Sequence, residues 1–316
     1  MVSARAGVIT AGFAILACHA QAFAADVALT IDDVPELTVI HDPAHRRQFN
    51  TRLAQELHRH HIPATAFVIG SQISGPGQAE QRLIVKRWRK FGIELGNHTF
   101  SHASPNKLGA DAYIADIAEG QKALTGLVPP LPGQTRWFRP PYLETGSPAP
   151  VRQQISAWLA DHGLSLAPVT MNSSDYVFAV VYQAALAAKD KARARSVRQA
   201  YLVYTKEMIA WSRSASHRLF GRDIAYVMLL HDSRLNADCL DDLVKVFTQA
   251  GLRFVSLEQA MTDPAYATPD RYSGPDGIDW LERWLLERTT MPDAEDEPEP
   301  PGAIRQDYDR LVNDDH

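Results

Sequence analysis

Two adjacent carboxylates and a pair of histidines are the residues of this 316-residue chain whose types and spacing first suggest chemistry. Asp32 and Asp33 follow an apolar run, and His98 and His102 lie four residues apart. Neighbouring side chains after a strand point in different directions, so one carboxylate could bind a cation while the other accepts a proton. Histidines at i and i+4 share one face of a helical turn, so both imidazoles could reach one metal ion.

Asp33, His98 and His102 together would form the two-histidine, one-carboxylate set of a catalytic zinc site, with one position left for water. The same set can hold Fe(II). Each part also has a structural interpretation, because the aspartates could lie in a surface turn and the histidines could be structural. The combination favours a metal site.

Three further strand ends carry polar residues. Arg139 precedes two prolines, the second of them Pro141, and then Tyr142. The prolines stiffen the loop, which holds the guanidinium in place and leaves the Tyr142 N–H free to face a site. His231 is a natural general acid, and Asp175 could orient it. Because barrel active sites are built at the C-terminal ends of the strands, five such signals in succession predict one shared site.

The elements that must position these residues alternate between short β-branched runs and amphipathic segments. Strands are expected at 27–31, 64–69, 93–95, 137–138, 166–170, 225–230 and 252–256. Helices are expected at 43–61, 79–91, 110–126, 151–162 and 238–250. Strands separated by helices imply parallel βαβ units, and seven strands instead of eight predict a distorted (β/α)7 barrel of parallel strands.

One connection is much longer than the others. Residues 177–222 separate the fifth and sixth strands, and their apolar residues recur at spacings of four and three, which predicts a helical insertion. The simpler interpretation is that the insertion packs on the side of the barrel, and the alternative is a cap over the cleft or an oligomer surface. A last helix near 279–288, with Trp280 and Trp284 on one face, is expected to dock on the barrel.

Composition excludes several classes of protein. Hydrophobic residues make up 45% and charged residues 22%, which rules out a chain that is disordered as a whole. No run of 18 apolar residues exists, so no integral membrane span is expected. The net charge is -5, but residues 291–316 alone carry -7, so residues 25–290 are close to neutral. A nucleic-acid partner is therefore not expected.

Both ends of the chain are expected to lie outside a catalytic domain at 25–290. Arg5, the apolar stretch that follows it, and small residues before position 25 predict a signal peptide over 1–24, and so export to the periplasm or the medium. Lipoprotein processing at Cys18 is the alternative. With cleavage after residue 24, Cys239 would be the only cysteine left, and its position on the apolar side of a helix predicts that it lies in the core. The acidic, proline-rich tail, 291–316, is expected to be disordered.

In this order the motifs resemble those of the polysaccharide deacetylases with a NodB-homology domain, carbohydrate esterase family four. The resemblance covers roughly residues 26–262. It implies that Asp33, His98 and His102 bind one divalent metal ion. Zinc is the first expectation, with cobalt or another divalent ion as the alternative.

The resemblance also implies roles for the other residues. Asp32 would be the base, held by Arg139, and His231 would protonate the leaving amine, tuned by Asp175. The substrate would be contacted by Pro141, Tyr142, Tyr176 and Leu230, with Leu230 lining the acetyl pocket. Tyr176 departs from the family's pattern, in which Trp usually follows the aspartate of the fourth motif, so one wall of the pocket would differ.

The expected activity is metal-dependent hydrolysis of N-acetyl groups on a carbohydrate that contains N-acetylglucosamine, such as peptidoglycan or a chitin-like oligomer. Other interpretations remain open: hydrolysis of a non-sugar amide, an acetyl esterase, or an inactive carbohydrate-binding protein. The sequence leaves the natural substrate and the oligomeric state undetermined.

Overall fold

The computed structural model describes residues 25–37, 46–288 and 297–313. The predicted signal peptide, including Cys18, lies outside these residues, as does the segment 289–296 of the acidic tail. Among the described helices, none is both long and apolar enough to span a bilayer.

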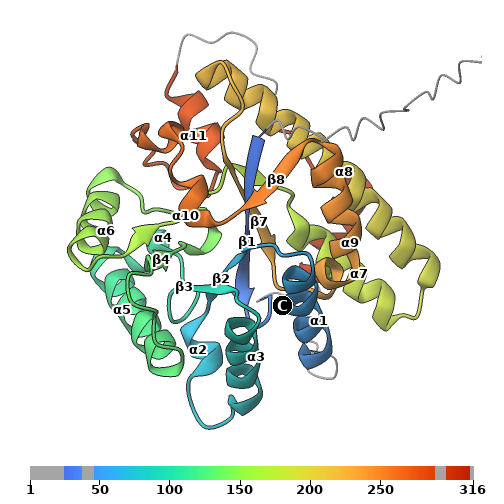
Figure 1. The fold of residues 1–316 in the computed structure, drawn as a ribbon, viewed down its shortest axis with the longest axis horizontal. Helices are drawn as coiled ribbons and strands as arrows, with labels where there is room; N and C mark the ends of the chain where they lie inside the picture. Colours follow the sequence, from blue (N-terminus) through green and yellow to red (C-terminus); the bar gives the residue numbers. More distant parts are fainter. Residues whose placement is uncertain (1–24, 38–45, 289–296, 314–316) are drawn as a thin grey trace, which may run out of the picture.

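A curved sheet of parallel strands forms the centre of the molecule, with helices around it (Figure 1). Its strands are β1 (Ala25–Val34), β2 (Thr65–Val68), β3 (Glu94–Asn97), β4 (Trp137–Phe138), β5 (Ser165–Leu166), β6 (Met171–Asn172), β7 (Tyr226–His231) and β8 (Leu252–Val255). They run in the order β5-β4-β3-β2-β1-β7-β6. β8 pairs with the first residues of β1, on the same side of β1 that pairs with β2 nearer its C-terminal end.

The predicted fifth strand, 166–170, is divided between β5 and β6. The Ala167 N–H donates to Phe138 O of β4, whereas the Thr170 N–H donates to Val227 O of β7. The intervening Pro168 has no N–H to continue a ladder. One predicted strand therefore crosses between the two ends of the sheet. This crossing gives the distorted seven-unit barrel that the sequence predicts.

Alternation along the strands separates the two faces of the sheet. In β1, Ala28 belongs to a small apolar cluster inside the barrel, whereas Leu29 and Ile31 pack in the main core beneath the helices. Because helices cover the outer face and the inner cluster fills the barrel, every residue of β1 from Val27 to Val34 is buried.

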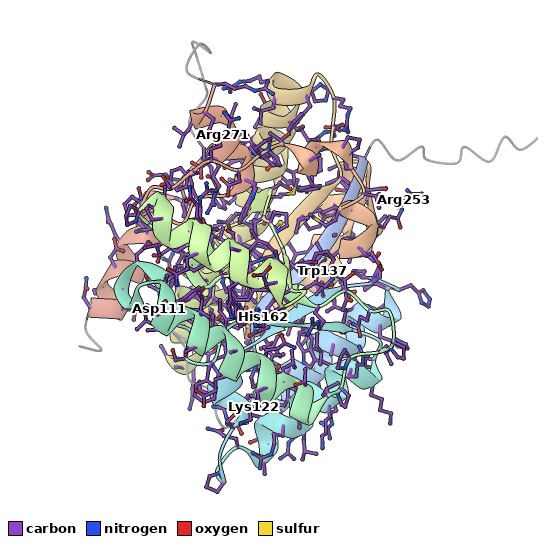
Figure 2. All side chains as sticks on the ribbon, turned by 90° about the vertical axis from the view of Figure 1, so that its left-hand side faces the viewer. Asp111, Lys122, Trp137, His162, Arg253 and Arg271 are labelled. Carbon is purple, nitrogen blue, oxygen red and sulfur yellow. The ribbon has the colours of Figure 1, made fainter. Side chains whose placement is uncertain are left out.

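The helices that cover the outer face begin and end close to the predicted positions. They are α1 (Arg46–Arg59), α3 (Ala79–Lys90), α5 (Ala110–Leu127), α6 (Ala149–Asp161), α9 (Arg234–Gln249) and α11 (Trp280–Leu286). Short turns add α2 (Gly70–Ile73), α4 (Pro105–Leu108), α10 (Leu257–Ala260), and the 3-10 helices η1 (Pro141–Leu143) and η2 (Pro264–Ala267). In Figure 2, α5, marked by Asp111 and Lys122, lies beside α6, whose last residue is followed by His162. Cys239 of α9 is fully buried, as expected.

The long insertion is helical, as predicted. It consists of α7 (Asp175–Ala187) and α8 (Lys191–Phe220). The predicted stripe on α8 is buried, including Val197, Tyr201 and Met208. α8 packs against α7, α9 and α11, which agrees with the interpretation of an insertion on the side of the barrel.

The prediction of a disordered tail is wrong for the described residues 297–313. Residues Gly302–Asn313 form helix α12, which packs against α7. Ile304 is buried in the main core, and Tyr308 and Leu311 pack against it. Their spacing of four and three residues is a helical stripe, which the acids and prolines around it obscure in the sequence.

Replacing Ile304 with Ala should release this helix from the core. The lost burial should lower the free energy of local opening of 302–313 by about 2–5 kcal/mol. Native-state hydrogen exchange would then show faster exchange in 302–313. Gln306→Ala, at an exposed position of the same helix, should leave the exchange unchanged. Equal protection in both variants would show that Ile304 does not anchor the helix.

Candidate active site

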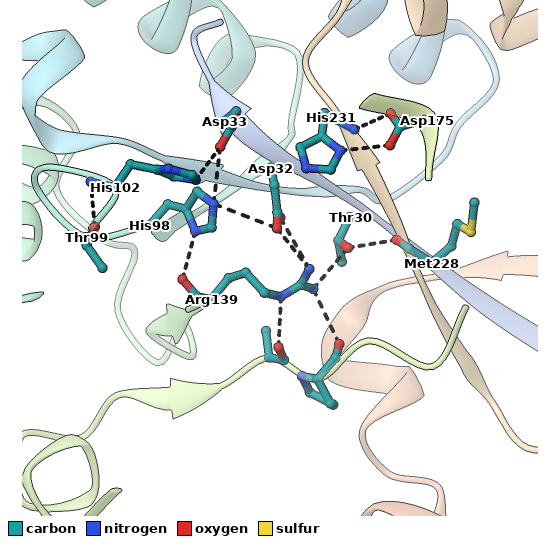
Figure 3. A network of polar contacts seen from close by, with 12 residues as sticks. Thr30, Asp32, Asp33, His98, Thr99, His102, Arg139, Asp175, Met228 and His231 are labelled. Atoms are coloured by element: carbon teal, nitrogen blue, oxygen red, sulfur yellow. Dashed lines mark hydrogen bonds and ion pairs between the residues drawn. The ribbon is translucent and has the colours of Figure 1, made fainter. Parts of the chain in front are cut away.

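The C-terminal ends of the strands surround a cavity of about 340 Å³. Residues predicted from the sequence line it, namely Asp32, Asp33, His98, His102, Tyr142, Tyr176 and His231. Arg139 and Asp175 are fully buried behind this lining. The structure therefore brings the predicted chemical residues of five strand ends together at one place (Figure 3).

Asp33 lies between the two histidines. Its Oδ1 is 3.3 Å from Nε2 of His98 and 3.1 Å from Nε2 of His102. Asp33 has a left-handed backbone with φ 61°. This conformation interrupts the alternation of β1, so Asp32 and Asp33 both reach the site although they are adjacent.

The hydrogen bonding of His98 suits a metal ligand. Its Nδ1 lies 2.8 Å from the Arg139 carbonyl oxygen, which can only accept, so Nδ1 carries the proton. In the neutral ring, Nε2 then presents a lone pair toward Asp33. Two lone pairs facing each other across a buried gap repel unless a cation lies between them. The three ligand atoms, all within 4.8 Å of one another, therefore fit a divalent metal ion.

Electrostatics keep Asp33 ionised. Burial by itself raises the pKa of this carboxyl. When the imidazoles carry both ring protons, the charge of His102 and the hydrogen bonds from His102 and His98 outweigh burial and hold the pKa of Asp33 well below its usual range. An ionised carboxylate is the form that binds a cation.

Asp32 is held by a fully buried arginine. Nη1 of Arg139 lies 3.3 Å and 3.2 Å from the two carboxylate oxygens of Asp32. The same guanidinium donates to the Thr30 hydroxyl at 3.1 Å and, through Nε, to the Ala167 carbonyl at 2.8 Å. Because every side of Arg139 is bonded, Asp32 has a fixed orientation beside Asp33.

His231 is held by Asp175 on the opposite side of the cavity. Nδ1 of His231 is 2.8 Å from Asp175 Oδ1, and the His231 N–H donates to Oδ2 at 2.7 Å. The Asn236 amide also donates to Asp175 Oδ2, at 2.5 Å. Burial lowers the pKa of His231, but the charge and hydrogen bond of Asp175, with smaller contributions from Asp33 and Asp32, raise it to about 9. The ring is therefore protonated at neutral pH.

Two aromatic side chains form part of the cavity wall. Tyr142, with 56% of its surface exposed, has its ring centroid 4.7 Å from that of His102. The Tyr176 ring lies 5.8 Å from His231 and 5.7 Å from Tyr308 of α12. Tyr308, which also lines the cavity, was not predicted. The sequence pattern that could have identified Tyr308 is the helical spacing of apolar residues within the acidic tail.

Two predicted substrate contacts do not reach the cavity. Leu230 is buried in the core beneath the helices, and its neighbour Leu229 lines the cavity instead. The reason is the alternation of β7, which turns Leu229 and His231 to the same face and Leu230 to the other. Pro141 is buried at the start of η1 and is absent from the cavity lining.

Removing the guanidinium of the buried Arg139–Asp32 pair should destabilise the whole fold. Arg139→Met leaves the Asp32 charge buried without its partner, which should lower the free energy of unfolding by about 3–5 kcal/mol. Equilibrium unfolding in guanidinium chloride, with EDTA present to remove metal ions, measures this free energy. The exposed matched variant, Arg136→Met, should change it by less than about 1 kcal/mol. The double variant Asp32→Asn/Arg139→Met should recover part of the lost free energy of unfolding. Equal destabilisation by Arg139→Met and Arg136→Met would contradict this account.

Comparison with known proteins agrees with the motifs. A family model described as polysaccharide deacetylase matches residues 22–166. A peptidoglycan-N-acetylglucosamine deacetylase from Bacillus cereus is 34% identical over 121 residues, which is 38% of this chain. The chain spans 37% of the length of that relative.

Solved structures share the fold. A chitin deacetylase from Colletotrichum lindemuthianum, 19% identical, superimposes with a TM-score of 0.52 over 80% of this chain and 94% of its own. A mutant of a CE4 family pseudoenzyme from Bacillus anthracis, 16% identical, gives 0.52 over 75% of this chain and 67% of its own. Since a pseudoenzyme has this fold, the fold alone does not establish activity. The family model covers the strand ends that carry Asp33, His98 and Arg139, so residues 22–166 are similar to the polysaccharide deacetylase family.

Proposed function

We propose that this protein hydrolyses N-acetyl groups on a carbohydrate that contains N-acetylglucosamine, in a metal-dependent reaction. The observation that carries the proposal is the meeting of three units around one cavity. These units are the Asp33–His98–His102 set, the Asp32–Arg139 pair and the His231–Asp175 pair. A set of metal ligands with a carboxylate on one side and a protonated imidazole on the other supplies the groups that acyl transfer to water requires.

The metal would be held by Asp33, His98 and His102. A divalent ion there supplies a Lewis acid that polarises the acyl carbonyl. Zinc fits two imidazoles and one carboxylate, and other divalent ions can occupy the same set.

Asp32 and His231 would divide the proton transfers between them. Asp32, paired with Arg139, would accept a proton from the attacking water. Because Nδ1 of His231 is bonded to Asp175, Nε2 is the ring nitrogen that can give a proton to the departing amine. The C–O bond forms first, as the carbonyl electron pair moves onto its oxygen. The C–N bond then breaks as that pair returns and the nitrogen takes its proton, so the products are acetate and a free amino sugar. The Tyr142 N–H would donate to the carbonyl oxygen as its charge develops.

The relatives' names support a glycan as the substrate. One is named a peptidoglycan-N-acetylglucosamine deacetylase and another a chitin deacetylase. The near-neutral charge of residues 25–290 suits a neutral or weakly anionic polymer. Tyr142 and Tyr176 would form the walls of the site, with Leu229 closing the apolar pocket of the acetyl group.

Acetate release from purified protein loaded with Zn²⁺ or Co²⁺ tests the proposal. The substrates are N-acetylglucosamine oligomers, peptidoglycan, an O-acetylated glycan and a simple aryl acetamide. We expect hydrolysis of at least one of the first two. Activity confined to the ester or to the aryl amide would replace the proposal with one of those activities. Stoichiometric metal without hydrolysis of any substrate would indicate a binding protein.

Asp33→Ala and His98→Ala should each reduce metal content and lower activity by at least about 100-fold, because each removes a metal ligand. Elemental analysis and the acetate assay measure the two effects. His217→Ala is the matched control, because this histidine is exposed and lies outside the site. Full activity in Asp33→Ala or His98→Ala would show that the ligand assignment is wrong.

The pH profile should report His231. As a general acid it must keep its proton, so kcat/KM should fall as the pH rises through the pKa of this ring. Asp175→Asn removes the carboxylate that raises that pKa, while burial continues to lower it. The alkaline limb should therefore move down by at least about one pH unit. An unmoved alkaline limb would exclude His231 as the group that titrates.

A further inference from the structure

A second group of oxygen ligands lies beside the active site. It consists of Asp279 and Glu282 at the start of α11 and Glu297, the first described residue after the 289–296 segment. One carboxylate oxygen from each lies within 4.8 Å of the other two. The three line a cavity of about 520 Å³ that shares Asn172 and Gly277 with the active-site cavity.

Asp279, which lines this cavity, carries a buried carboxylate oxygen without a hydrogen-bond partner. Its side chain is buried, at 2% exposure. Oδ1 accepts the Glu282 N–H at 3.0 Å and so caps α11, but Oδ2 is buried and accepts no hydrogen bond from the described residues. A carboxylate oxygen removed from water without a partner is costly, so the position calls for a donor or a cation.

Nearby cationic side chains bond elsewhere. Arg283 donates to Asp270 at 2.9 Å and to the Leu143 carbonyl at 2.6 Å, and Arg305 pairs with Asp309 at 3.2 Å. No ion pair between described residues involves the three clustered carboxylates.

We propose that Asp279, Glu282 and Glu297 bind a hard divalent cation, Ca²⁺, at a site distinct from the Asp33–His98–His102 set. Ca²⁺ takes six to eight oxygen ligands in a flexible geometry, so three carboxylates leave room for water in the open cavity. With no nitrogen or sulfur ligand in the group, the softer ions that suit the histidine set are disfavoured.

The cation would fasten the C-terminal segment to the barrel. Glu297 belongs to the chain that leads into α12, whereas the other two ligands belong to α11. Next to Glu297, the Pro298 carbonyl accepts the Tyr204 hydroxyl at 2.6 Å, and α12 brings Tyr308 to the wall of the active-site cavity. Binding of Ca²⁺ would therefore hold one wall of that cavity in place.

Calorimetric titration of the Zn²⁺-loaded full chain with CaCl₂ tests the site without any substrate. We expect saturable binding of one ion, and a dissociation constant at least about tenfold weaker in Asp279→Asn and in Glu297→Gln. Asn keeps the helix cap, so Asp279→Asn removes charge without removing that hydrogen bond. Glu299→Gln is the matched control, because it removes the same charge from an exposed residue that lines the same cavity but is not one of the three clustered ligands. It should bind Ca²⁺ like the wild type.

Limited proteolysis gives a second readout on the same proteins. Ca²⁺ should slow cleavage between 297 and 301 in the wild type and in Glu299→Gln, but not in the two cluster variants. No saturable binding at millimolar Ca²⁺, or equal weakening in all three variants, would overturn the proposal. Circular dichroism and zinc content identify a misfolded variant, and Glu297→Gln then decides the outcome if Asp279→Asn fails to fold.

Discussion

The buried guanidinium of Arg139 is the interaction on which the rest of this structure depends. It donates hydrogen bonds to Asp32 and Thr30 of β1, and to the Ala167 carbonyl of the segment that crosses from β5 to β6. The carbonyl of the same residue sets the proton position on His98. One residue therefore orients the proposed base, supports a metal ligand and holds the point where the barrel changes from β5 to β6. A buried charge with this many partners is stable only when all of them are present.

The opposite side of the cavity depends on the helical insertion. Asp175 begins α7 and holds His231, and Asn236 of α9 donates to Asp175. The Tyr201 hydroxyl of α8 in turn donates to Asn236 Oδ1 at 2.8 Å. The long insertion is thus more than packing on the side of the barrel, because its buried stripe reaches the group that fixes the proposed acid. The C-terminal helix makes a similar contribution through Tyr308, which contacts Tyr176 and lines the cavity.

Local patterns in the sequence determined much of this protein. The alternation of apolar runs and amphipathic segments predicted nearly every strand and helix, since each pattern reports which face of an element is buried. The motifs at the strand ends predicted the site, because parallel strands place their C-terminal ends together wherever they fall in the chain. Asp33, His98, His102, Arg139 and His231 could all be identified in this way.

Tertiary structure alone decided the remaining features, and each depends on contacts between residues far apart in the chain. The division of one predicted strand into β5 and β6 depends on which neighbour each half meets, β4 or β7. Leu229 rather than Leu230 lines the cavity because the register of β7 against β1 sets which side chains face inward. Likewise, α12 docks because α7 offers it an apolar surface. A sequence pattern can show that a segment has something to bury, but the partner that buries it is chosen only when the chain folds.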